Sequence, residues 1–364
     1  MVNLESPLLD PNYRMPVDEV CRLRKGISDF LKEGLEVTDD DFGSGSGIVI
    51  SAGGFKYFTC TYVLISTLRN LGCQLPIEVW YYQDELTFDM RSSLSKFNVT
   101  CRDMEGFVEG RPHGFLMKSL AILYSDFEEV LFLDADNNCV KDPTYLFQVP
   151  QYLEHGCIFW PDYWMHSPNN QIWEIFNLPP QNCPEQESGQ LLINKKKCWQ
   201  ALQLAVYLNI NSEYIYRFMY GDKDSYRIAW MYLEVPYFFI QTPPGSFGYM
   251  FNGKQFHGNT MSQYDPNGDI IFLHRNLIKW HVTYRNERLW QIHKSFKPHA
   301  KDLSCNIRRH KKTNYIDLVG DVDVVEYSTL IPNLEEACLR ALSELRGHPF
   351  YQEELLHSYI RESR

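Results

Sequence analysis

Short apolar runs alternate with helical patterns along the first half of the chain. Runs rich in aliphatic and β-branched residues predict buried strands at residues 48–50, 77–82 and 130–133. Apolar residues at helical spacing, or in one almost wholly apolar stretch, predict helices at residues 58–71, 87–96 and 114–124. Strands that alternate with helices of this length indicate βαβ units, so we predict an α/β fold around a parallel sheet.

The alternation becomes less regular further along the chain. Strands are predicted at residues 157–160, 191–193 and 269–273, and helices at residues 196–208 and 334–345. Residues 1–46 are predicted to be an N-terminal extension outside the core, with a short helix at 17–31 and a flexible Gly/Ser joint at its end. Residues 281–364 are predicted to form a helical or irregular tail, in which the basic run 308–312 is a solvated loop.

Composition limits the possible functions. The 364 residues allow about two domains, and 44% hydrophobic with 22% charged residues is typical of a globular protein. The net charge of -11 argues against a nucleic-acid partner, which needs clustered Lys and Arg. The ten cysteines form no CxxC pair, so we expect most of them to be buried thiols.

Hydropathy gives no targeting or membrane-spanning segment. Residues 1–13 lack the apolar core of a signal peptide, and no later window reaches the length of a membrane span. From the sequence as given we therefore expect no transmembrane segment and a cytoplasmic location.

Two carboxylates follow the apolar run at residues 130–133. Asp134 and Asp136 stand where that strand should end, and ligands of parallel α/β sheets collect at the carboxyl ends of strands. Carboxylate oxygens suit Mg²⁺ or Mn²⁺, which typically link one or two protein carboxylates to substrate phosphates. The pair predicts an enzyme that handles a diphosphate with a divalent metal.

Other polar residues allow both structural and functional interpretations. His274 follows the strand at 269–273, where it is either a structural residue or a ligand that converges on Asp136. Lys118 is the single charge on its helix, and it either extends to water or reaches a phosphate or the Asp pair. Gly53 and Gly54 allow close approach of a nucleotide or simply make a tight turn.

Two further stretches each allow two interpretations. The aromatic residues between Trp160 and Trp164 suit either a sugar-binding surface or ordinary core packing. Asp222 and Asp224, on either side of Lys223, open a predicted helix. Capping explains one acidic residue there, and the alternation of charges favours a second catalytic loop.

Several of these motifs together resemble glycosyltransferase family 71, the fungal α-mannosyltransferases. The resemblance depends on Ala52-Gly53-Gly54, Phe132-Leu133-Asp134-Ala135-Asp136-Asn137, Asp142-Pro143, Phe159-Trp160-Pro161-Asp162, Glu187-Ser188-Gly189-Gln190, Gly221-Asp222-Lys223-Asp224 and Phe272-Leu273-His274-Arg275-Asn276. It implies a GT-A fold with a mixed, mostly parallel central sheet, and a catalytic domain at residues 47–280.

The resemblance also implies the reaction. A hexose would move from a nucleotide sugar to a glycan or glycoconjugate acceptor with retention of configuration. The expected donor is GDP-mannose, with a UDP-hexose as the other possibility. Membership would further imply a Golgi location, although the familiar N-terminal membrane helix is missing from this sequence.

Roles carry over to the matching positions. The expected ligands of Mn²⁺ or Mg²⁺ are Asp134, Asp136 and His274. The expected donor-binding residues are Ala52, Gly53, Gly54, Lys118, Asp134, Glu187, Ser188 and Gly189. The expected catalytic residues, which orient the sugar or assist its departure, are Asp222, Asp224, Gln190 and Lys279.

The sequence departs from the family at one place beside the metal motif and leaves two rival functions. Family members commonly have Asn, an aliphatic residue and Pro after the second Asp, where this chain has Asn137-Asn138-Cys139. A haloacid-dehalogenase-type phosphatase also places Asp-x-Asp after a strand, but it needs Thr or Val where Asn138 stands. A non-catalytic carbohydrate-binding protein would leave Asp134, Asp136 and His274 without a purpose.

Overall fold

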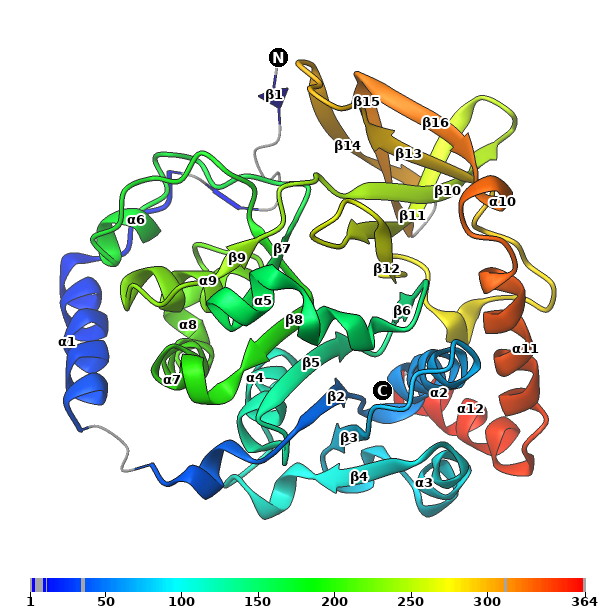
Figure 1. Ribbon diagram of the computed structural model, residues 1–364, viewed down its shortest axis with the longest axis horizontal. Helices are drawn as coiled ribbons and strands as arrows, with labels where there is room; N and C mark the ends of the chain where they lie inside the picture. The colour runs from blue at the N-terminus through cyan, green and yellow to red at the C-terminus, as the bar shows by residue number, and fades with distance from the viewer. Residues whose placement is uncertain (1, 4–8, 11, 34–36, 311–312, 363–364) are drawn as a thin grey trace.

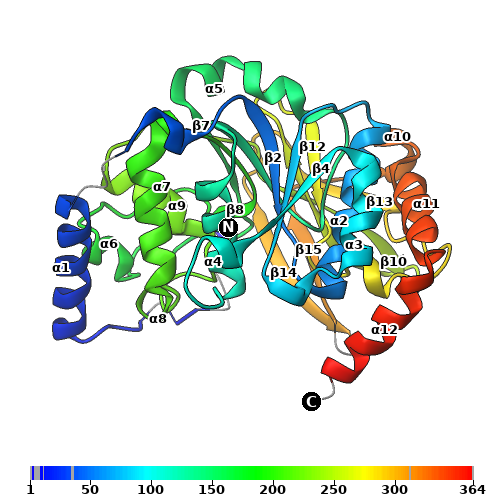
Figure 2. The same ribbon diagram turned by 90° about the horizontal axis from the view of Figure 1, so that it is seen from below.

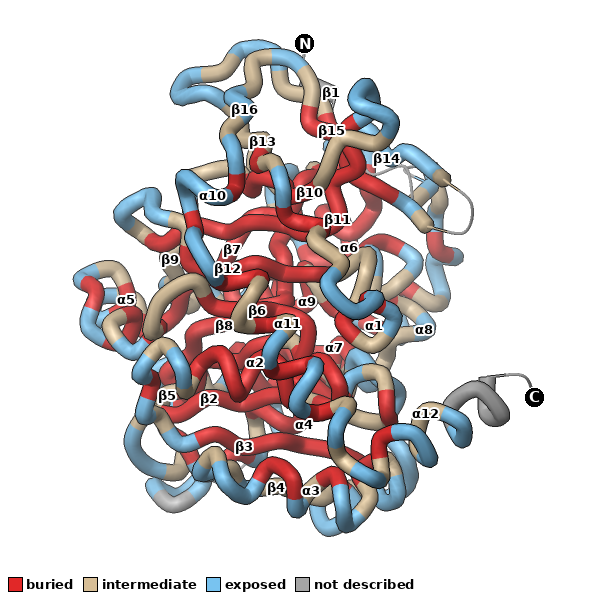
Figure 3. Tube along the Cα trace, turned by 90° about the vertical axis from the view of Figure 1, so that its right-hand side faces the viewer, coloured by how far each residue is buried: buried red, intermediate tan, exposed pale blue. Residues whose placement is uncertain are grey.

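The protein forms two β-sheets with helices packed around them. The computed structural model describes residues 2–3, 9–10, 12–33, 37–310 and 313–362. Figure 1 shows the first sheet in the lower half of the view, the second at the top, and α11 and α12 along the right-hand edge. The central strands of both sheets are buried, whereas strands at the edges are partly exposed (Figure 3).

The first sheet has seven strands. Its order is β4 (Val99–Asp103), β3 (Ile77–Tyr81), β2 (Ser46–Ser51), β5 (Glu129–Asp134), β8 (Gln186–Asn194), β7 (Cys157–Pro161) and β9 (Phe238–Phe239). The pairs β2/β3, β3/β4, β2/β5 and β7/β9 are parallel, and β8 is antiparallel to both of its neighbours. The predicted α/β class with a mixed, mostly parallel sheet is confirmed.

Helices cover both faces of this sheet. The main ones are α1 (Val17–Glu33), α2 (Gly54–Asn70), α3 (Phe88–Leu94), α4 (Gly114–Tyr124), α7 (Lys195–Ile210), α9 (Lys223–Tyr232), α11 (Leu334–Arg346) and α12 (Pro349–Glu362). Ile48 and Ile50 of β2 join the core under α2 and α11, whereas Val49 joins the core under α4 and α7. Figure 2 shows the two helical layers on either side of β2. This alternation follows from the two-residue period of a strand, whose faces are both buried here.

The second sheet shows that the prediction for residues 281–364 was wrong. It has nine strands and includes β10 (Gly245–Phe251), β11 (Gln255–Tyr264) and β12 (Ile270–His274). Four more strands lie in the segment predicted to be a helical or irregular tail: β13 (Ile292–Phe296), β14 (Leu303–His310), β15 (Thr313–Gly320) and β16 (Val322–Glu326). The predicted helix of the tail is present as α11.

The basic run lies mainly in β14 and not in a loop. Arg308, Arg309 and His310 pair with β15, and the remaining predicted loop residues, Lys311 and Lys312, lie outside the described residues. Cys305 is the one buried residue in β14, so the strand lacks the apolar run that would reveal it in the sequence. Pairing with β15 stabilises a strand that local composition does not indicate.

The N-terminal extension also differs from its prediction, because α1 packs on the core. Val20, Leu23 and Ile27 are buried against the cluster that contains α7. The Gly/Ser stretch is held as well, since the Ser44 N–H donates to Asp126 O at 2.8 Å and a Cβ on Gly43 would lie 2.3 Å from that oxygen. The domain limits themselves stay predictions.

The environment of the cysteines and the apolar character of the helices can be compared with the sequence predictions. All ten cysteines are free, and seven of them are buried, as predicted. Of the helices among the described residues, none combines the length and apolar character needed to cross a membrane.

A buried histidine in the second sheet predicts acid sensitivity. His293 is 3% exposed, and burial lowers its pKa to about 4, while an unfolded chain has a histidine pKa of about 6.5. The unfolded state therefore binds more protons between these values, and stability falls as pH drops through this window. This group should cost about 2 kcal/mol at pH 5 relative to pH 8.

The measurement compares urea unfolding of the wild type and His293→Gln at both pH values. Because the variant has no imidazole, it should lose less stability between pH 8 and pH 5 than the wild type by about 2 kcal/mol. Equal losses in the two proteins would show that His293 does not cause this part of the acid sensitivity.

Candidate active site

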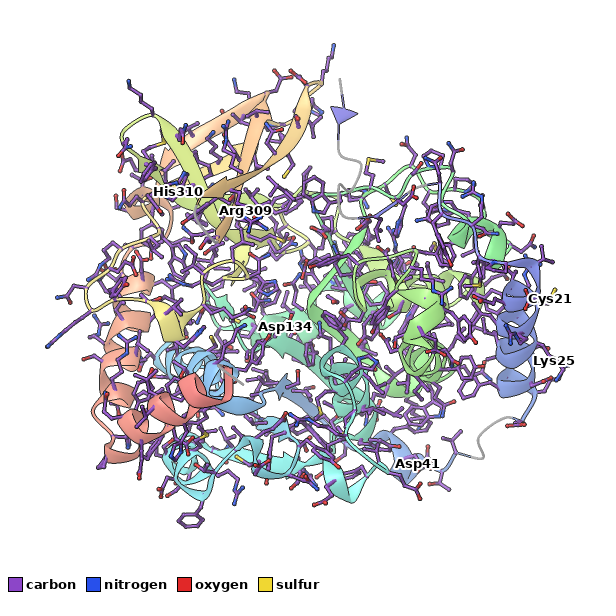
Figure 4. All side chains as sticks on the ribbon, turned by 180° about the vertical axis from the view of Figure 1, so that it is seen from behind. Cys21, Lys25, Asp41, Asp134, Arg309 and His310 are labelled. Atoms are coloured by element: carbon purple, nitrogen blue, oxygen red, sulfur yellow. The ribbon has the colours of Figure 1, made fainter. Side chains whose placement is uncertain are left out.

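The predicted Asp pair lies where the strand order of the first sheet reverses. The chain runs outward from β2 through β3 to β4, and then returns to place β5 on the other side of β2. Ligands of open α/β sheets bind at such a switch point, outside the carboxyl ends of the strands. Asp134 is the last residue of β5 and pairs with Ser51 at the end of β2. Figure 4 shows Asp134 near the middle of the molecule.

A short antiparallel ladder brings His274 to this edge. β6 (Asn137–Cys139) pairs with β12, and His274 lies opposite Asn137. The next residue, Arg275, donates its backbone N–H to Asp136 O at 2.9 Å. His274 Nε2 therefore lies 3.3 Å from Asp136 Oδ1 and 3.7 Å from Asp134 Oδ2. The structure thus brings together the three residues expected to bind a metal.

Strand β8 adds Glu187 to the cluster. Gln190 pairs with Leu133, so the preceding residues of β8 run alongside the end of β5. Glu187 Oε1 lies 3.3 Å from His274 Nδ1 and accepts the Gly189 N–H at 2.9 Å. Asp134, Glu187 and His274 each offer one ligand atom, all within 4.8 Å of one another.

Gly189 is required at its position because the imidazole of His274 lies against it. A Cβ there would come within 2.5 Å of His274 Nδ1 and 2.6 Å of its Cε1. Real Cβ atoms do not approach neighbours this closely, so a side chain at residue 189 would displace the ring. The predicted donor-binding glycine therefore has a structural reason that the sequence did not reveal.

Two lysines contact the same carboxylates. Lys118 is 4% exposed, lies 3.2 Å from both Asp134 Oδ1 and Asp222 Oδ2, and donates to Ser188 O at 2.8 Å. Of its two predicted positions, Lys118 thus takes the one beside the Asp pair and does not extend to water. Lys279 forms an ion pair with Asp136 Oδ2.

Burial and the attraction between opposite charges have opposing effects on the pKa values of the cluster. Burial alone would raise the pKa of Asp136, but Lys279 and His274 outweigh it and hold that pKa well below its usual range. Burial also opposes ionisation of Glu187, yet His274 and the nearby lysines lower its pKa to about 2. Conversely, Asp136 and Glu187 raise the pKa of His274 to about 10 against the effect of burial. Asp136 and Glu187 are therefore anionic near neutral pH.

The predicted catalytic residues divide into two groups. Asp222 belongs to the cluster, since it contacts Lys118 and accepts the Ser188 Oγ–H at 3.1 Å. Asp224 has other partners: it accepts the Gln186 N–H at 3.1 Å and pairs with Arg227 at 2.8 Å. These contacts give Asp224 a structural explanation as the residue that fixes β8 to α9.

Gln190 lies beside the cluster and is held by a neighbour. Its Oε1 accepts from Asn137 Nδ2 at 2.7 Å, and the same amide donates to Gly189 O at 2.8 Å. Gln190 Nε2 is buried and has no hydrogen-bond partner among the residues that the structure describes. The bridging role of Asn137 was not predicted, although Asn137 belongs to the motif that carries the family resemblance.

The predicted nucleotide-binding turn shows a structural need for both glycines. Ala52 is buried and donates its N–H to Trp80 O at 2.8 Å. A Cβ on Gly53 would lie 2.2 Å from Glu85 Oε2, and Gly54 has φ +73°, a backbone region that favours glycine. Both glycines are thus needed for the turn into α2, and the contact with a nucleotide stays a prediction.

A second buried ionic network, which we did not predict, adjoins the cluster. Lys223 pairs with Asp162 and lies 3.5 Å from Glu185 Oε2. His166 lies 3.4 Å from Glu185 Oε1 and 3.1 Å from Asp224 Oδ2. The signal for Lys223 was its place between two aspartates, but nothing local in the sequence indicated Glu185 or His166.

The aromatic patch is part of the core. Trp160 is 0% exposed, and Tyr163 and Trp164 are 5% and 6% exposed. Of the two interpretations left open, core packing is therefore the one that the structure supports, and the aromatic basis for a separate carbohydrate-binding surface is removed.

Comparison with known proteins identifies the family. The family model described as "Mannosyltransferase putative" matches residues 45–185 and 174–265, which is more than half of the chain. The chain belongs to this mannosyltransferase family. The resemblance predicted from the motifs is thereby confirmed.

Curated relatives agree with this assignment. The chain is 28% identical over 322 residues to "Alpha-1,2-mannosyltransferase MNN2" of Saccharomyces cerevisiae, covering 73% of this chain and 53% of that protein. It is 25% identical over 328 residues to "Alpha-1,2-mannosyltransferase MNN22" of Candida albicans, covering 74% of this chain and 55% of that protein. The chain thus spans about half the length of these relatives.

The solved structures that resemble the chain include a glycosyltransferase. The structure titled "WbbM bifunctional glycosytransferase apo structure" superposes with a TM-score of 0.41 at 14% identity, covering 57% of this chain and 40% of that one. This likeness is limited to part of the fold.

Proposed function

We propose that this member of the mannosyltransferase family transfers mannose from GDP-mannose to a mannose-bearing glycan, with a divalent metal and with retention of configuration. The observation that supports this most is the meeting of Asp134, Asp136 and His274 at the switch point of the sheet. Their side chains come from the end of β5, the turn after it and the end of β12, and two lysines lie beside them.

The donor set fits a divalent cation. Asp134, Glu187 and His274 supply two carboxylates and one imidazole within 4.8 Å of one another, and Asp136 adjoins His274. Within the described residues, His274 Nδ1 and Asp222 Oδ2 are buried and form no hydrogen bond, although Glu187 Oε1 and Lys118 Nζ lie 3.3 and 3.2 Å from them. Oxygen ligands with one imidazole suit Mn²⁺ or Mg²⁺. A metal bound there would supply Lewis-acid stabilisation of a diphosphate leaving group.

The lysines would serve the leaving group in the same region. Lys279 is held against Asp136, and Lys118 against Asp134 and Asp222. Each ammonium is a compact cation that can bind phosphate oxygens once its ion pairs with these carboxylates open. Among the expected sugar-orienting residues, Asp222 has the contacts that place it in the cluster, and we assign it that role.

The relatives supply the proposed sugar and linkage. Both are named α-1,2-mannosyltransferases. Because GDP-mannose carries mannose in α linkage, an α-linked product keeps the configuration of the donor. We therefore propose an α-1,2-linked mannoside as product, with no general base required on the opposite face of the sugar.

The test is a donor and acceptor screen with the purified chain. GDP-mannose and UDP-hexoses are incubated with Mn²⁺ and an α-mannoside, and the released nucleotide and the anomeric configuration of the product are measured. We expect release of GDP that depends on both the metal and the acceptor, and an α-linked product. UDP release, a β-linked product or full activity in EDTA would each contradict the corresponding part of the proposal.

Gly189→Ala should weaken metal binding without touching a proposed ligand. The new Cβ would lie 2.5 Å from His274 Nδ1 and force the imidazole out of place. Changes that misplace a ligand side chain typically cost about 10–100-fold in metal affinity. Calorimetric titration with Mn²⁺ measures this loss.

Gly106→Ala is the matched control, because a Cβ there has no neighbour within 4 Å and its φ is not positive. It should bind Mn²⁺ like the wild type. If Gly189→Ala also keeps wild-type affinity, His274 is not a ligand of the metal.

A further inference from the structure

Four arginines line a cavity that is separate from the candidate active site. The cavity has a volume of about 480 Å³ and lies between α11 and the loop that leads from β12 to β13. Figure 1 shows this loop, drawn in yellow, beside α11 at the edge of the molecule. The charged residues among the cavity lining are Arg285, Arg288, Arg340, Arg346 and Glu336. Four cations against one anion stand out in a chain with a net charge of -11.

Two of these guanidinium groups have no partner among the described residues. Arg285 and Arg340 are exposed and make no hydrogen bond or ion pair with any part of the chain that the structure describes. A third is only partly satisfied, since Arg288 Nε donates to Glu336 at 2.9 Å while its Nη1 is buried and has no hydrogen-bond partner in the described part of the chain. The cavity therefore offers hydrogen-bond donors and positive charge that the described residues do not satisfy.

Arg346 connects α11 to the loop that forms the other wall of the cavity. It donates to Thr283 O at 2.7 Å, which fixes the middle of the loop against α11. The wall is therefore held in place before any ligand arrives, and ordering the loop should cost little binding energy.

We propose that this cavity binds a multiply charged phosphate anion. The planar fork of a guanidinium matches phosphate oxygens, often through two parallel hydrogen bonds. The net charge of the lining favours an anion with more than one negative charge, and the volume lies in the ordinary range for small-molecule pockets. The source of the phosphate is either a soluble compound or the headgroup of a lipid.

The cavity can be tested apart from the active site because the cations of the two sites differ in their partners. Without a divalent metal, Lys118, Lys279 and His274 are paired with carboxylates of the candidate active site, whereas Arg285 and Arg340 have no partner among the described residues. Calorimetric titration of the full chain with inorganic pyrophosphate in EDTA therefore reports on the cavity. In parallel, sedimentation with phosphatidylcholine vesicles, with and without phosphatidylinositol 4-phosphate, tests the headgroup.

The decisive variant is Arg285→Ala/Arg340→Ala. Both side chains are exposed and make no contact that the fold needs, so the variant should keep its stability. Loss of charge-assisted hydrogen bonds to phosphate should weaken binding at least about tenfold. Lys301→Ala/Arg309→Ala removes the same charge from exposed positions outside the cavity and should bind like the wild type. Figure 4 labels Arg309 on the second sheet.

Each outcome decides the proposal. Binding of pyrophosphate that is lost only in the arginine variant supports it with a soluble phosphate as ligand, and vesicle binding lost in the same way supports it with a lipid headgroup. Failure of the wild type to bind either probe overturns it. Equal weakening in both double variants also overturns it, because general charge would then explain the binding.

Discussion

Asp136→Asn is expected to lower the rate of sugar transfer about a thousandfold. The change removes one negative charge from the proposed metal site, and stabilisation of a leaving group by a metal is worth several kcal/mol, of which about 4 kcal/mol corresponds to this factor. The Asp136 carboxylate also pairs with Lys279 and lies 3.3 Å from His274 Nε2, so both partners lose a counter-charge. The measurement is the initial rate of GDP release with saturating GDP-mannose, Mn²⁺ and acceptor.

Asp317→Asn separates this effect from a loss of stability. Asp317 is also buried and paired, with Lys294 at 2.6 Å and Arg308 at 2.9 Å, but it lies in β15 of the second sheet. Its variant should unfold at a lower urea concentration and still transfer sugar at close to the wild-type rate. A similar fall in activity for both variants would point to general destabilisation, and an Asp136→Asn rate within about tenfold of wild type would remove Asp136 from the proposed site.

Arg275→Leu is expected to lower the free energy of unfolding by about 3–5 kcal/mol, the usual cost of removing one partner from a buried ionic contact, which Arg275 makes with Glu335 Oε1 at 3.7 Å. Arg275 is fully buried, and its guanidinium lies 3.9 Å from the centre of the Trp280 ring. Its Nε donates to Ile278 O at 2.6 Å, and its Nη2 donates to Thr283 Oγ1 at 2.8 Å. One side chain thus holds the turn that carries Lys279. Urea unfolding followed by tryptophan fluorescence measures the loss.

Arg22→Leu is the control for this change. Arg22 pairs with Asp18 on the surface of α1, and its side chain is 64% exposed. Such pairs contribute about 0–1 kcal/mol, so the control should unfold almost like the wild type. If Arg275→Leu is no less stable than Arg22→Leu, the guanidinium does not hold the turn.

The elements that the sequence predicted well are those with strong local patterns. The stretch at residues 114–124 coincides with α4, and the apolar runs before Asp134 and at residues 77–82 coincide with β5 and β3 within a residue. Most of β3 and β5 and the middle of α4 are buried, so their composition reflects the environment that they occupy.

Strands with polar faces were missed for the opposite reason. In β14 and β16 most residues are exposed or half-buried, and their sequences carry no apolar run. Their existence depends on pairing with β15 and β13, which is a long-range interaction. Local pattern alone therefore leads to the wrong prediction of an irregular tail.

The residues of the candidate site divide in the same way, into those that local sequence predicts and those that depend on long-range packing. Asp134 and Asp136 could be predicted because a strand and two carboxylates adjoin in the sequence, and His274 because it ends another strand. The proximity of Glu187 to His274 and the need for Gly189 depend on the register of β8 against β5 and on the ring that lies over it. The register of one strand against another cannot be inferred from the spacing of residues along the sequence.

By itself, the sequence determined the α/β class, the family and the strand ends that carry the acidic and imidazole groups. These features are local, since they follow from periodicity and from motifs within a few residues. The tertiary structure alone decided which carboxylates face Lys118 and Lys279, that Asp224 pairs with Arg227, and that four arginines share one cavity. These features require side chains from distant segments to pack together, and the interactions that select the packing are not visible until the chain has folded.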